Sequence, residues 1–185
     1  MTNTHNNTAT DILNFWFHEI TPTQWWKKSV EFDNEIKNRF LNIYKKAAVS
    51  ELISWRSKPL SSLAEIIILD QFPRNIFRDK KQAFATDPLA LCLTQTAIDK
   101  GFDHELPPDQ RAFLYMPLMH SESIEIHKTA EKIFSAPGME NYLNFELKHK
   151  AIIDRFGRYP HRNHILGRRM KKAELEFLKE PNSSF

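Results

Sequence analysis

Apolar residues recur every three or four positions along most of the chain, and this spacing places them on one face of an α-helix. Phe32, Ile36 and Phe40 are a clear example, because they follow one another at intervals of about one helical turn. The alternation of apolar and polar residues that marks a half-buried strand does not occur, and the chain has only four glycines. The pattern predicts an all-α protein.

Prolines, glycines and capping residues divide this pattern into about eight helices. The expected elements in the first half are a short helix at 10–18, a helix of about four turns around 32–44, a helix opened by a Ser62–Glu65 capping box and ended by Pro73, and a helix with Asp87 as N-cap, Pro88 as first residue and Gly101 just past its end. In the second half we expect a helix from Pro107 that Pro117 ends or kinks, a helix opened by Ser121 or Ser123, a long helix between Pro137-Gly138 and Gly157, and a short helix at 170–179. The connections hold no Ser/Gly-rich linker, so we expect one helical domain over residues 1–185. Antiparallel hairpins of the tetratricopeptide kind are the expected architecture, although the consensus of that repeat is not legible.

The composition is typical of a globular protein. Hydrophobic residues make up 41% of the 185 residues, which is enough for a sizeable core. No apolar run exceeds five residues and the first ten residues are polar, so we expect neither a membrane-spanning helix nor a signal sequence. The single cysteine, Cys92, excludes an internal disulfide and a multi-thiolate metal site. A reducing cytoplasm is the expected location.

Positive charge gathers toward the C-terminal end. Residues 147–172 hold nine Lys and Arg against one acid, a charge of +8, whereas the whole chain carries +3, which leaves −5 for the rest. Such a field attracts phosphate metabolites, acidic partners or nucleic acid, although Lys and Arg are also typical of solvated helix faces. Trp16, Trp25 and Trp26 follow the apolar periodicity and are expected in the core, so nucleic acid is not a favoured partner.

Asp70 is the most informative single residue. It shares a helix face with the apolar positions 63, 66 and 67 and lies in the last expected turn, where the helix dipole disfavours an anion. A buried carboxylate needs a partner or serves a function. Arg74, Asn75 and Arg78 follow closely, and with Asp70 they are candidate ligand-binding residues. The alternative is a buried Asp–Arg pair that only holds the turn.

His149 lies in the middle of another apolar stripe, and Glu146 precedes it by three residues. We expect a hydrogen-bonded Glu146–His149 pair that is either structural or an acid–base pair in catalysis. Glu-x-x-His is also the spacing of carboxylate-bridged di-iron ligands, but no second copy occurs. A metal held by Glu146, His149 and a loop histidine, His161 or His164, is a further alternative, and the identity of any cofactor is left open.

The segment 157–164 holds two arginines, two histidines and an asparagine. Arginine forks suit carboxylate or phosphate oxygens, so Arg158, Arg162 and Asn163 are candidate contacts for a small anionic molecule or an acidic peptide end. The alternative is that these side chains cap helix ends by bonding to orphan carbonyls.

The turn His120-Ser121-Glu122 has the residue types of a nucleophile motif. Adjacent residues do not face one another as a catalytic triad does, and Ser121 is better explained as a helix N-cap. His120 and Glu122 are further candidate ligand-binding residues. His120 precedes the expected cap, so its side chain can point into the same cavity as the other candidate residues.

Three long motifs occur in order, at 68–75 (ILDQFPRN), 113–122 (FLYMPLMHSE) and 155–163 (RFGRYPHRN). Together with the stretches 12–17 and 174–178, they resemble the signature segments of a bacterial family known as domain of unknown function 924. The resemblance implies an all-α, tetratricopeptide-like fold and a soluble cytoplasmic protein, and it implies no activity. One departure is that Lys171 and Lys172 stand where the resemblance leads us to expect a Ser/Thr-Pro helix start.

These residues support three hypotheses. In the first, the Asp70 turn, the His120 turn and the 157–164 segment converge on one polar cleft that binds a small anionic ligand. In the second, the same cleft belongs to a hydrolase or lyase, with His149 or His161 as general base, Glu146 as carboxylate partner, and with or without a metal. The third, a scaffold for another protein, follows from fold analogy alone. No membrane partner is expected, and the oligomeric state is left open.

Overall fold

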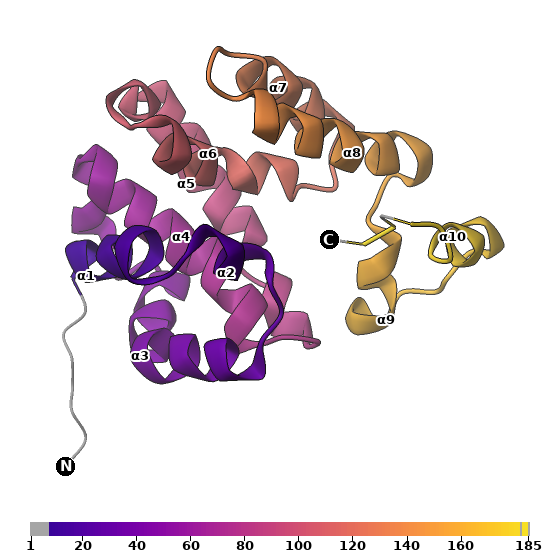
Figure 1. The fold of residues 1–185 in the computed structure, drawn as a ribbon, viewed down its shortest axis with the longest axis horizontal. Coiled ribbons are helices and arrows are strands. Elements are labelled where there is room, and N and C mark those ends of the chain that lie inside the picture. Colours follow the sequence, from indigo (N-terminus) through magenta and orange to yellow (C-terminus); the bar gives the residue numbers. More distant parts are fainter. Residues whose placement is uncertain (1–7, 182, 185) are drawn as a thin grey trace. The chain divides into compact units, whose positions relative to one another are not determined.

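A computed structural model describes residues 8–181, 183 and 184, and it is helical, with no strand among these residues (Figure 1). The α-helices are α1 (Ala9–Asn14), α2 (Pro22–Trp26), α3 (Val30–Ala48), α4 (Pro59–Ile76), α5 (Asp87–Asp99), α6 (Pro108–Met119), α7 (Ile124–Phe134), α8 (Glu140–Phe156), α9 (Asn163–Leu166) and α10 (Lys172–Phe177). Short 3-10 helices lie at Ile53–Ser57, Lys81–Phe84, Phe102–Glu105 and Pro160–Arg162, and a π-helical turn lies at Phe15–Glu19. The predicted all-α class is confirmed. None of the described helices is long and apolar enough to cross a membrane.

The chain divides into two compact units. Unit 1 comprises Met1–Arg78 and Gln82–Pro117, and unit 2 comprises Asp79–Lys81 and Leu118–Phe185. The single-domain organisation and the tetratricopeptide-like hairpins expected from the sequence stay predictions.

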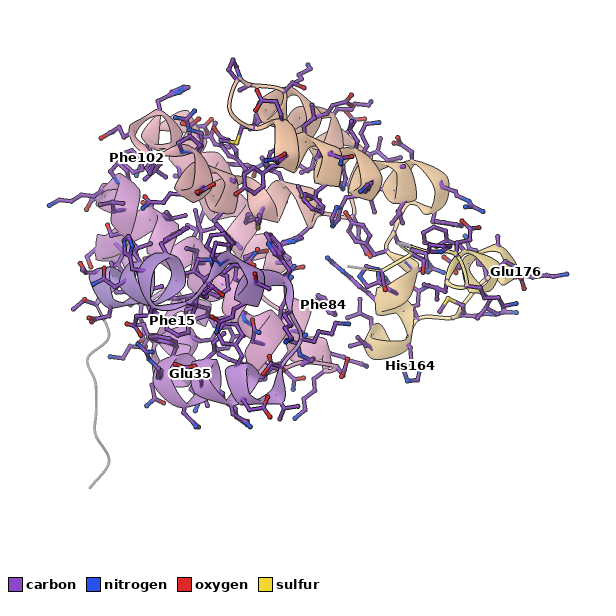
Figure 2. All side chains as sticks on the ribbon, viewed as in Figure 1. Phe15, Glu35, Phe84, Phe102, His164 and Glu176 are labelled. Carbon is purple, nitrogen blue, oxygen red and sulfur yellow. The ribbon has the colours of Figure 1, made fainter. Side chains whose placement is uncertain are left out.

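Helix α4 forms the centre of unit 1, where α1, α3 and α5 pack against it. Its residues from Ser62 to Pro73 are all buried, which is why its sequence is apolar almost all round instead of on one face. Phe72 of α4 packs against Phe15, Trp16 and Phe40, with ring centroids 4.9–6.2 Å apart. Phe15 is labelled in Figure 2. Aromatic burial of this kind supplies much of the core energy.

The three tryptophans expected in the core differ in exposure. Trp16 is buried, and its backbone carbonyl accepts a hydrogen bond from Trp25 Nε1 at 2.9 Å. Trp25 is half-buried, whereas Trp26 is 59% exposed. The core prediction is therefore wrong for Trp26, because that residue is the last one of the short helix α2 and its ring stacks on Phe113 from outside.

The predicted end of α4 at Pro73 is wrong, since the helix continues to Ile76. A proline inside a helix cannot donate to the carbonyl four residues earlier, which is Leu69 here. The hydroxyl of Thr86 donates to that carbonyl at 2.6 Å and replaces the missing bond. A side chain far along the chain thus allows the helix to pass through Pro73.

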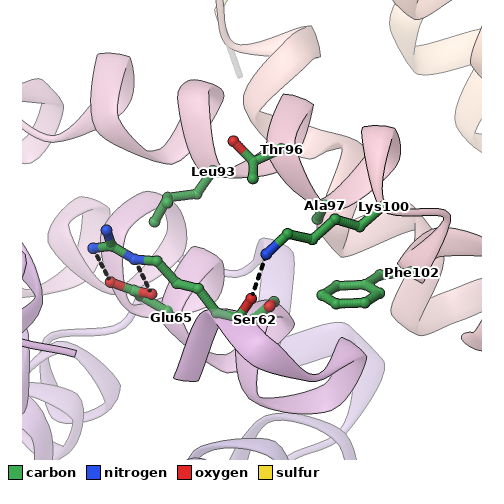
Figure 3. A pocket seen from close by; sticks show the side chains of 8 residues that line it. Ser62, Glu65, Leu93, Thr96, Ala97, Lys100 and Phe102 are labelled. Atoms are coloured by element: carbon green, nitrogen blue, oxygen red, sulfur yellow. Dashed lines mark hydrogen bonds and ion pairs between the residues drawn. The ribbon is translucent and has the colours of Figure 1, made fainter. Parts of the chain in front are cut away.

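The predicted capping box at Ser62 and Glu65 is also wrong, because α4 already begins at Pro59. Glu65 is fully buried and binds Arg56 through two hydrogen bonds of 2.7 and 2.9 Å (Figure 3). Lys100 donates to the carbonyl of Arg56 at 2.8 Å, so the carboxylate and both cations brace the start of α4 against α5.

Other predicted boundaries agree with the structure to within a few residues. Helix α6 begins at Pro108 but runs through Pro117 to Met119. Gly101 and Gly157 follow the ends of α5 and α8 with positive φ angles of 72° and 68°, as expected for glycine past a helix end. Helix α10 is shorter than predicted, and Ser123 instead of Ser121 is the N-cap residue of α7.

Unit 2 contains the hairpin of α7 and α8, which pack side by side (Figure 1), followed by the segment that carries α9 and α10. Ile152 and Ile153 of α8 form a buried cluster with Tyr159 and Phe177. Tyr159 is fully buried although it lies outside the α-helices, between α8 and the 3-10 turn at Pro160–Arg162. Its ring fixes the path of the chain after Gly157.

Candidate functional site

The candidate residues from the sequence are distributed over both units. Asp70, Arg74, Asn75 and Arg78 belong to unit 1, whereas His120, Glu122, Glu146, His149, Arg158, His161, Arg162 and Asn163 belong to unit 2. The convergence of both sets on one cleft stays a prediction. Each set has a geometry of its own.

In unit 1, Asp70 lies on α4 with 1% of its surface exposed, as its helix face predicts. Gln71 Nε2 donates to Asp70 Oδ2 at 2.5 Å, and Arg74 Nη1 lies 3.4 Å from Asp70 Oδ1. The guanidinium of Arg74 also donates to the Asp70 carbonyl and to both carboxylate oxygens of Asp87, at 3.1 Å each. The Asp70–Arg74 contact therefore belongs to a network that ties the end of α4 to the start of α5.

The last turn of α4 and the residues that follow it carry a second network. Arg78 donates from Nε and Nη2 to the two carboxylate oxygens of Asp33, at 2.5 and 2.6 Å, and Asn75 Nδ2 donates to Asp33 Oδ1 at 2.9 Å. Asp33 lies in the first turn of α3, where a carboxylate is favourable to the helix dipole. Asn75 and Arg78 thus bind Asp33 in the first turn of α3, within unit 1.

In unit 2, the ring of Tyr159 is surrounded by basic side chains. His149 and His161 lie with ring centroids 5.8 and 5.5 Å from that of Tyr159, and the guanidinium carbon of Arg162 lies 4.6 Å from its centre. His120 follows at 6.4 Å from His149. We call His120, His149, Tyr159, His161 and Arg162 the Tyr159 cluster. His149, Tyr159 and Arg162 are buried, whereas His120 and His161 are half-buried.

The hydroxyl of Tyr159 holds the cluster to the end of α6. It donates to the carbonyl of Met119 at 2.6 Å and lies 3.2 Å from Nε2 of His127. The Tyr159 backbone N–H donates to Glu122 at 2.8 Å, so both ends of this residue are bound to the turn around His120.

A buried pair missed by the sequence analysis lies behind this hydroxyl. His127 of α7 and Glu146 of α8 are both fully buried, with 2.6 Å between His127 Nδ1 and Glu146 Oε1. The expected pairing of Glu146 with His149 is therefore wrong. His149 lies three residues from Glu146 on α8, but Glu146 pairs instead with the His127 ring of the facing helix α7, which lies within hydrogen-bond distance of its carboxylate.

The partners of His127 fix the number of protons in this pair. His127 Nε2 lies 2.9 Å from the carbonyl of Ser121, which can only accept, so Nε2 carries a proton. One further proton is then shared between Nδ1 and Oε1, and the pair has no net charge in either arrangement. Burial raises the pKa of Glu146, which favours the form in which the proton lies on the carboxyl group.

His149 has a defined tautomer as well. Its Nδ1 lies 2.8 Å from the carbonyl of Phe145, one turn earlier on α8, so Nδ1 carries a proton and donates. Burial and, to a smaller extent, nearby groups that include the Arg162 guanidinium together lower the pKa of His149 to about 3, although the bond to the Phe145 carbonyl acts in the opposite direction. The ring is therefore neutral at physiological pH, with an acceptor lone pair on Nε2.

The chain as a whole was compared with known proteins. A family model described as a bacterial protein of unknown function, DUF924, matches residues 12–182. The chain belongs to the DUF924 family. A solved structure of a protein of unknown function from Agrobacterium tumefaciens is 40% identical, with a TM-score of 0.88, and the match covers 92% of this chain and 96% of that one. The search of curated proteins gives no match. The resemblance seen in the sequence motifs is thus confirmed.

In this DUF924 protein, Glu122 is bound to a partner that the sequence analysis missed. Arg168 donates to both of its oxygens at 2.5 and 2.9 Å, and also to the carbonyl of Tyr159 at 3.1 Å. Burial alone raises the pKa of Glu122, but the bonds from Arg168 and from the Tyr159 N–H hold it below its usual value. Glu122 is a carboxylate that fixes the Tyr159 backbone.

Arg158 and Asn163 are tied to the C-terminal part of the same unit. Arg158 donates to both oxygens of the buried Glu174, at 2.6 and 2.8 Å, and to the carbonyl of Arg169 at 2.9 Å. These bonds from Arg158, together with one from the Lys171 N–H, lower the pKa of Glu174 to about 2. Asn163 is fully buried, and its Nδ2 lies 3.2 Å from the sulfur of Met170.

The signals for the missed residues differ in kind. His127 lies on the same stripe of α7 as the buried Ala130 and Phe134, so its burial was readable from the helical period. Arg168 and Glu174 gave no such signal, because their partners Glu122 and Arg158 are 46 and 16 residues away. Among the residues that the structure describes, no group of three or more His, Cys, Asp or Glu could hold a metal ion.

Proposed function

We propose that the protein binds a small anionic ligand at the Tyr159 cluster. The observation that carries this proposal is the buried guanidinium of Arg162, which lies over the Tyr159 ring in contact with a group of histidines. Burial is the main cause of the low pKa of His149, and the positive charge of Arg162 adds to it. An anion at this position would be attracted by the same field, which burial strengthens.

The surrounding carboxylates are bound by other basic residues. Glu122 bonds to Arg168, Glu146 to His127, and Glu174 to Arg158. The positive charge of Arg162 also acts on Glu122 and helps to lower its pKa, so this guanidinium attracts an anionic group in the protein itself. The arginine fork of Arg162 suits the planar or tetrahedral oxygens of carboxylates and phosphates.

The predicted ligand residues then have different roles. His120, His161 and Arg162 contact the ligand in this proposal, whereas Glu122, Arg158 and Asn163 position the segment that carries them. Asp70, Arg74, Asn75 and Arg78 would add to the same cleft only if the two units bring them to it, and this extension is part of the sequence hypothesis.

Isothermal titration of the purified chain with phosphate and with small carboxylates tests the proposal. Arg162→Gln removes the guanidinium, and Arg169→Gln removes an equal charge from an exposed side chain of the same basic segment. We expect Arg162→Gln to weaken binding about tenfold or more, the range for losing a charge-assisted hydrogen bond, and Arg169→Gln to leave it unchanged. Equal losses in both variants would mean that only the general charge of the segment attracts anions.

A hydrolase or lyase at the same position is the second candidate. One observation favours it, namely the chain of polar contacts from Glu146 through His127 to the hydroxyl of Tyr159. His149 is too weak a base for this role because its pKa is about 3, so His161 is the general base in this version. Turnover of a phosphate or carboxylate ester that is abolished in His161→Gln, with binding retained, would support it. Full turnover in that variant would exclude His161.

A further inference from the structure

We propose that Arg155, Phe156 and Arg158 form a docking surface for a helix of a partner protein, and that α10 of the chain itself occupies this surface in the structure. The partner helix carries an acid, an aromatic residue and a second acid at intervals of three residues. We call the three residues the Arg155 surface and residues 169–181 the α10 segment, and both lie within unit 2. The inference goes beyond the proposed function and does not depend on it.

Three side chains of the α10 segment contact the Arg155 surface, and they are three residues apart in the sequence, which is about one helical turn. The contacts run in antiparallel order along the end of α8 and the turn after it. They are Glu174 with Arg158, Phe177 with Phe156, and Glu180 with Arg155. The α10 segment thus presents an acid, a ring and an acid to a surface that offers a guanidinium, a ring and a guanidinium.

The contact between Glu174 and Arg158 couples docking to helix formation. Glu174 is fully buried, and Arg158 donates to its two oxygens at 2.6 and 2.8 Å. The same carboxylate accepts a hydrogen bond of 2.6 Å from the Lys171 backbone N–H, at the start of α10. Helices as short as α10 are not stable in water without tertiary contacts. We therefore expect the segment to form its helix only on the surface, as peptides that fold on binding do.

The middle of the Arg155 surface is apolar and its edge is positive. The ring centroids of Phe156 and Phe177 are 5.0 Å apart, and the guanidinium carbon of Arg155 lies 4.8 and 5.4 Å from them. Arg155 Nη1 also lies 3.7 Å from Glu180, and both of these charged side chains are 52% exposed. A buried aromatic anchor inside a charged rim is the usual anatomy of a protein–protein interface.

The charge of the surface selects an acidic partner. Among the described residues, the side-chain hydrogen bonds of Arg158 all go to the α10 segment, namely to Glu174 and to the Arg169 carbonyl. Detachment of the segment leaves this guanidinium fork without its carboxylate, and a carboxylate of a partner restores the bonds. A basic helix would meet like charge at both arginines of the surface.

The α10 segment has few buried side chains to hold it in place. Only Glu174 and Phe177 of α10 are buried, and Leu175 is 49% exposed. Residues 168–171, which lead into α10, have no regular secondary structure. Arg168, just before the segment, is bound to Glu122 and limits any detachment to the residues that follow it. Such a segment opens at a lower free energy than the core does.

Hydrogen exchange of the wild-type chain at low urea concentrations measures this opening. Amides 175 and 178–180 are hydrogen-bonded within the segment, and we expect them to exchange through a local opening that does not depend on urea. We expect its free energy to be lower than that of the amides of α8. If both sets of amides have the same free energy of opening and the same urea dependence, the segment leaves the surface only on global unfolding and the proposal is wrong.

Fluorescence anisotropy with a labelled synthetic peptide of residues 169–181 tests whether the surface accepts the segment from another molecule. In the wild-type chain the attached segment competes at an effective concentration of about 1 mM, so the peptide should bind weakly. Phe177→Ala removes the aromatic anchor of the attached segment only, and we expect this variant to bind the peptide about tenfold or more tightly. Leu175→Ala is the matched control on the same helix and should keep the wild-type affinity.

The Phe177→Ala chain then tests the chemistry of recognition. A peptide with Glu174→Gln should bind about tenfold more weakly, because it loses the charge-assisted bonds to Arg158. A peptide with Glu176→Gln loses the same charge from an exposed position and should bind as the original peptide does (Figure 2). Arg158→Gln in the chain should weaken binding to a similar extent, whereas Lys148→Gln, which removes an exposed charge of α8, should not.

Several results would overturn the proposal. Equal binding of the two altered peptides would mean that only the general charge of unit 2 attracts them, and a folded Phe177→Ala chain that binds no peptide would have no docking surface. A concentration-dependent dimer of the wild-type chain that the peptide dissociates would show that the occupant is the α10 segment of a second copy instead of another protein. Should Phe177→Ala fail to fold, the hydrogen exchange of the wild-type chain decides.

Discussion

The buried pair of His127 and Glu146 allows a quantitative test of the proton count. Glu146→Ala removes the partner of a fully buried ring nitrogen, which costs about 1–3 kcal/mol. It also leaves a cavity where a methylene and a carboxyl group were, which adds about 1 kcal/mol. Removal of Glu146 Oε2, a buried atom with no hydrogen-bond partner among the described residues, offsets part of this loss. We expect a net destabilisation of about 2–4 kcal/mol, close to the range for broken buried pairs.

Glu146→Gln should behave differently because the pair carries one shared proton and no net charge. Neutral His127 keeps its Nε2–H on the carbonyl of Ser121, and its Nδ1 lone pair then accepts from the amide N–H of the glutamine. The variant preserves volume and bonding, so we expect a loss of less than about 1 kcal/mol.

Urea denaturation followed by far-ultraviolet circular dichroism measures both variants. For a chain of this length, the loss in Glu146→Ala corresponds to a Tm decrease of roughly 5–15 °C. Glu125→Ala is a suitable control, since this exposed side chain of α7 makes a surface ion pair with Lys128 at 2.7 Å. If Glu146→Gln is as unstable as Glu146→Ala, the pair needs its charges and the shared-proton argument is wrong.

Three further predictions concern stability. His149 takes up a proton below pH 6.5 in the unfolded chain but only near pH 3 in the folded protein, so the free energy of unfolding should fall with decreasing pH in this interval, by about 1.4 kcal/mol per pH unit. Denaturation curves at pH 6.5 and pH 5 should therefore show a smaller loss of stability for His149→Gln than for the wild-type chain. Thr86→Val removes the donor to the Leu69 carbonyl and should cost about 1–3 kcal/mol in a urea titration, whereas Thr86→Ser should retain most of the stability. The low pKa of Glu174 makes the contribution of its bonds to Arg158 complete above pH 4.5, and this contribution is lost as the pH falls toward 2, so an acid-unfolding titration should show a flatter profile for Glu174→Gln.

The sequence predicted most of the helices because helical periodicity and end signals are local. The glycine after α5 and the glycine after α8 mark their helix ends through a backbone preference that no other part of the chain needs to supply. Pro73 is a position at which the local sequence is insufficient. Whether α4 continues past this proline depends on the hydroxyl of Thr86, and the residues around Pro73 do not indicate that partner.

The same distinction applies to the candidate site. The burial of Asp70 and His149 could be predicted, because each lies on the apolar face of its own helix. Their partners could be predicted only in part. The contact of Asp70 with Arg74 agrees with the Asp–Arg pair that the sequence offers as an alternative, whereas Asp87 and the His127 ring that binds Glu146 come from other helices. Hydrogen-bond partners depend on which helices pack together, and a single sequence gives only the faces that pack.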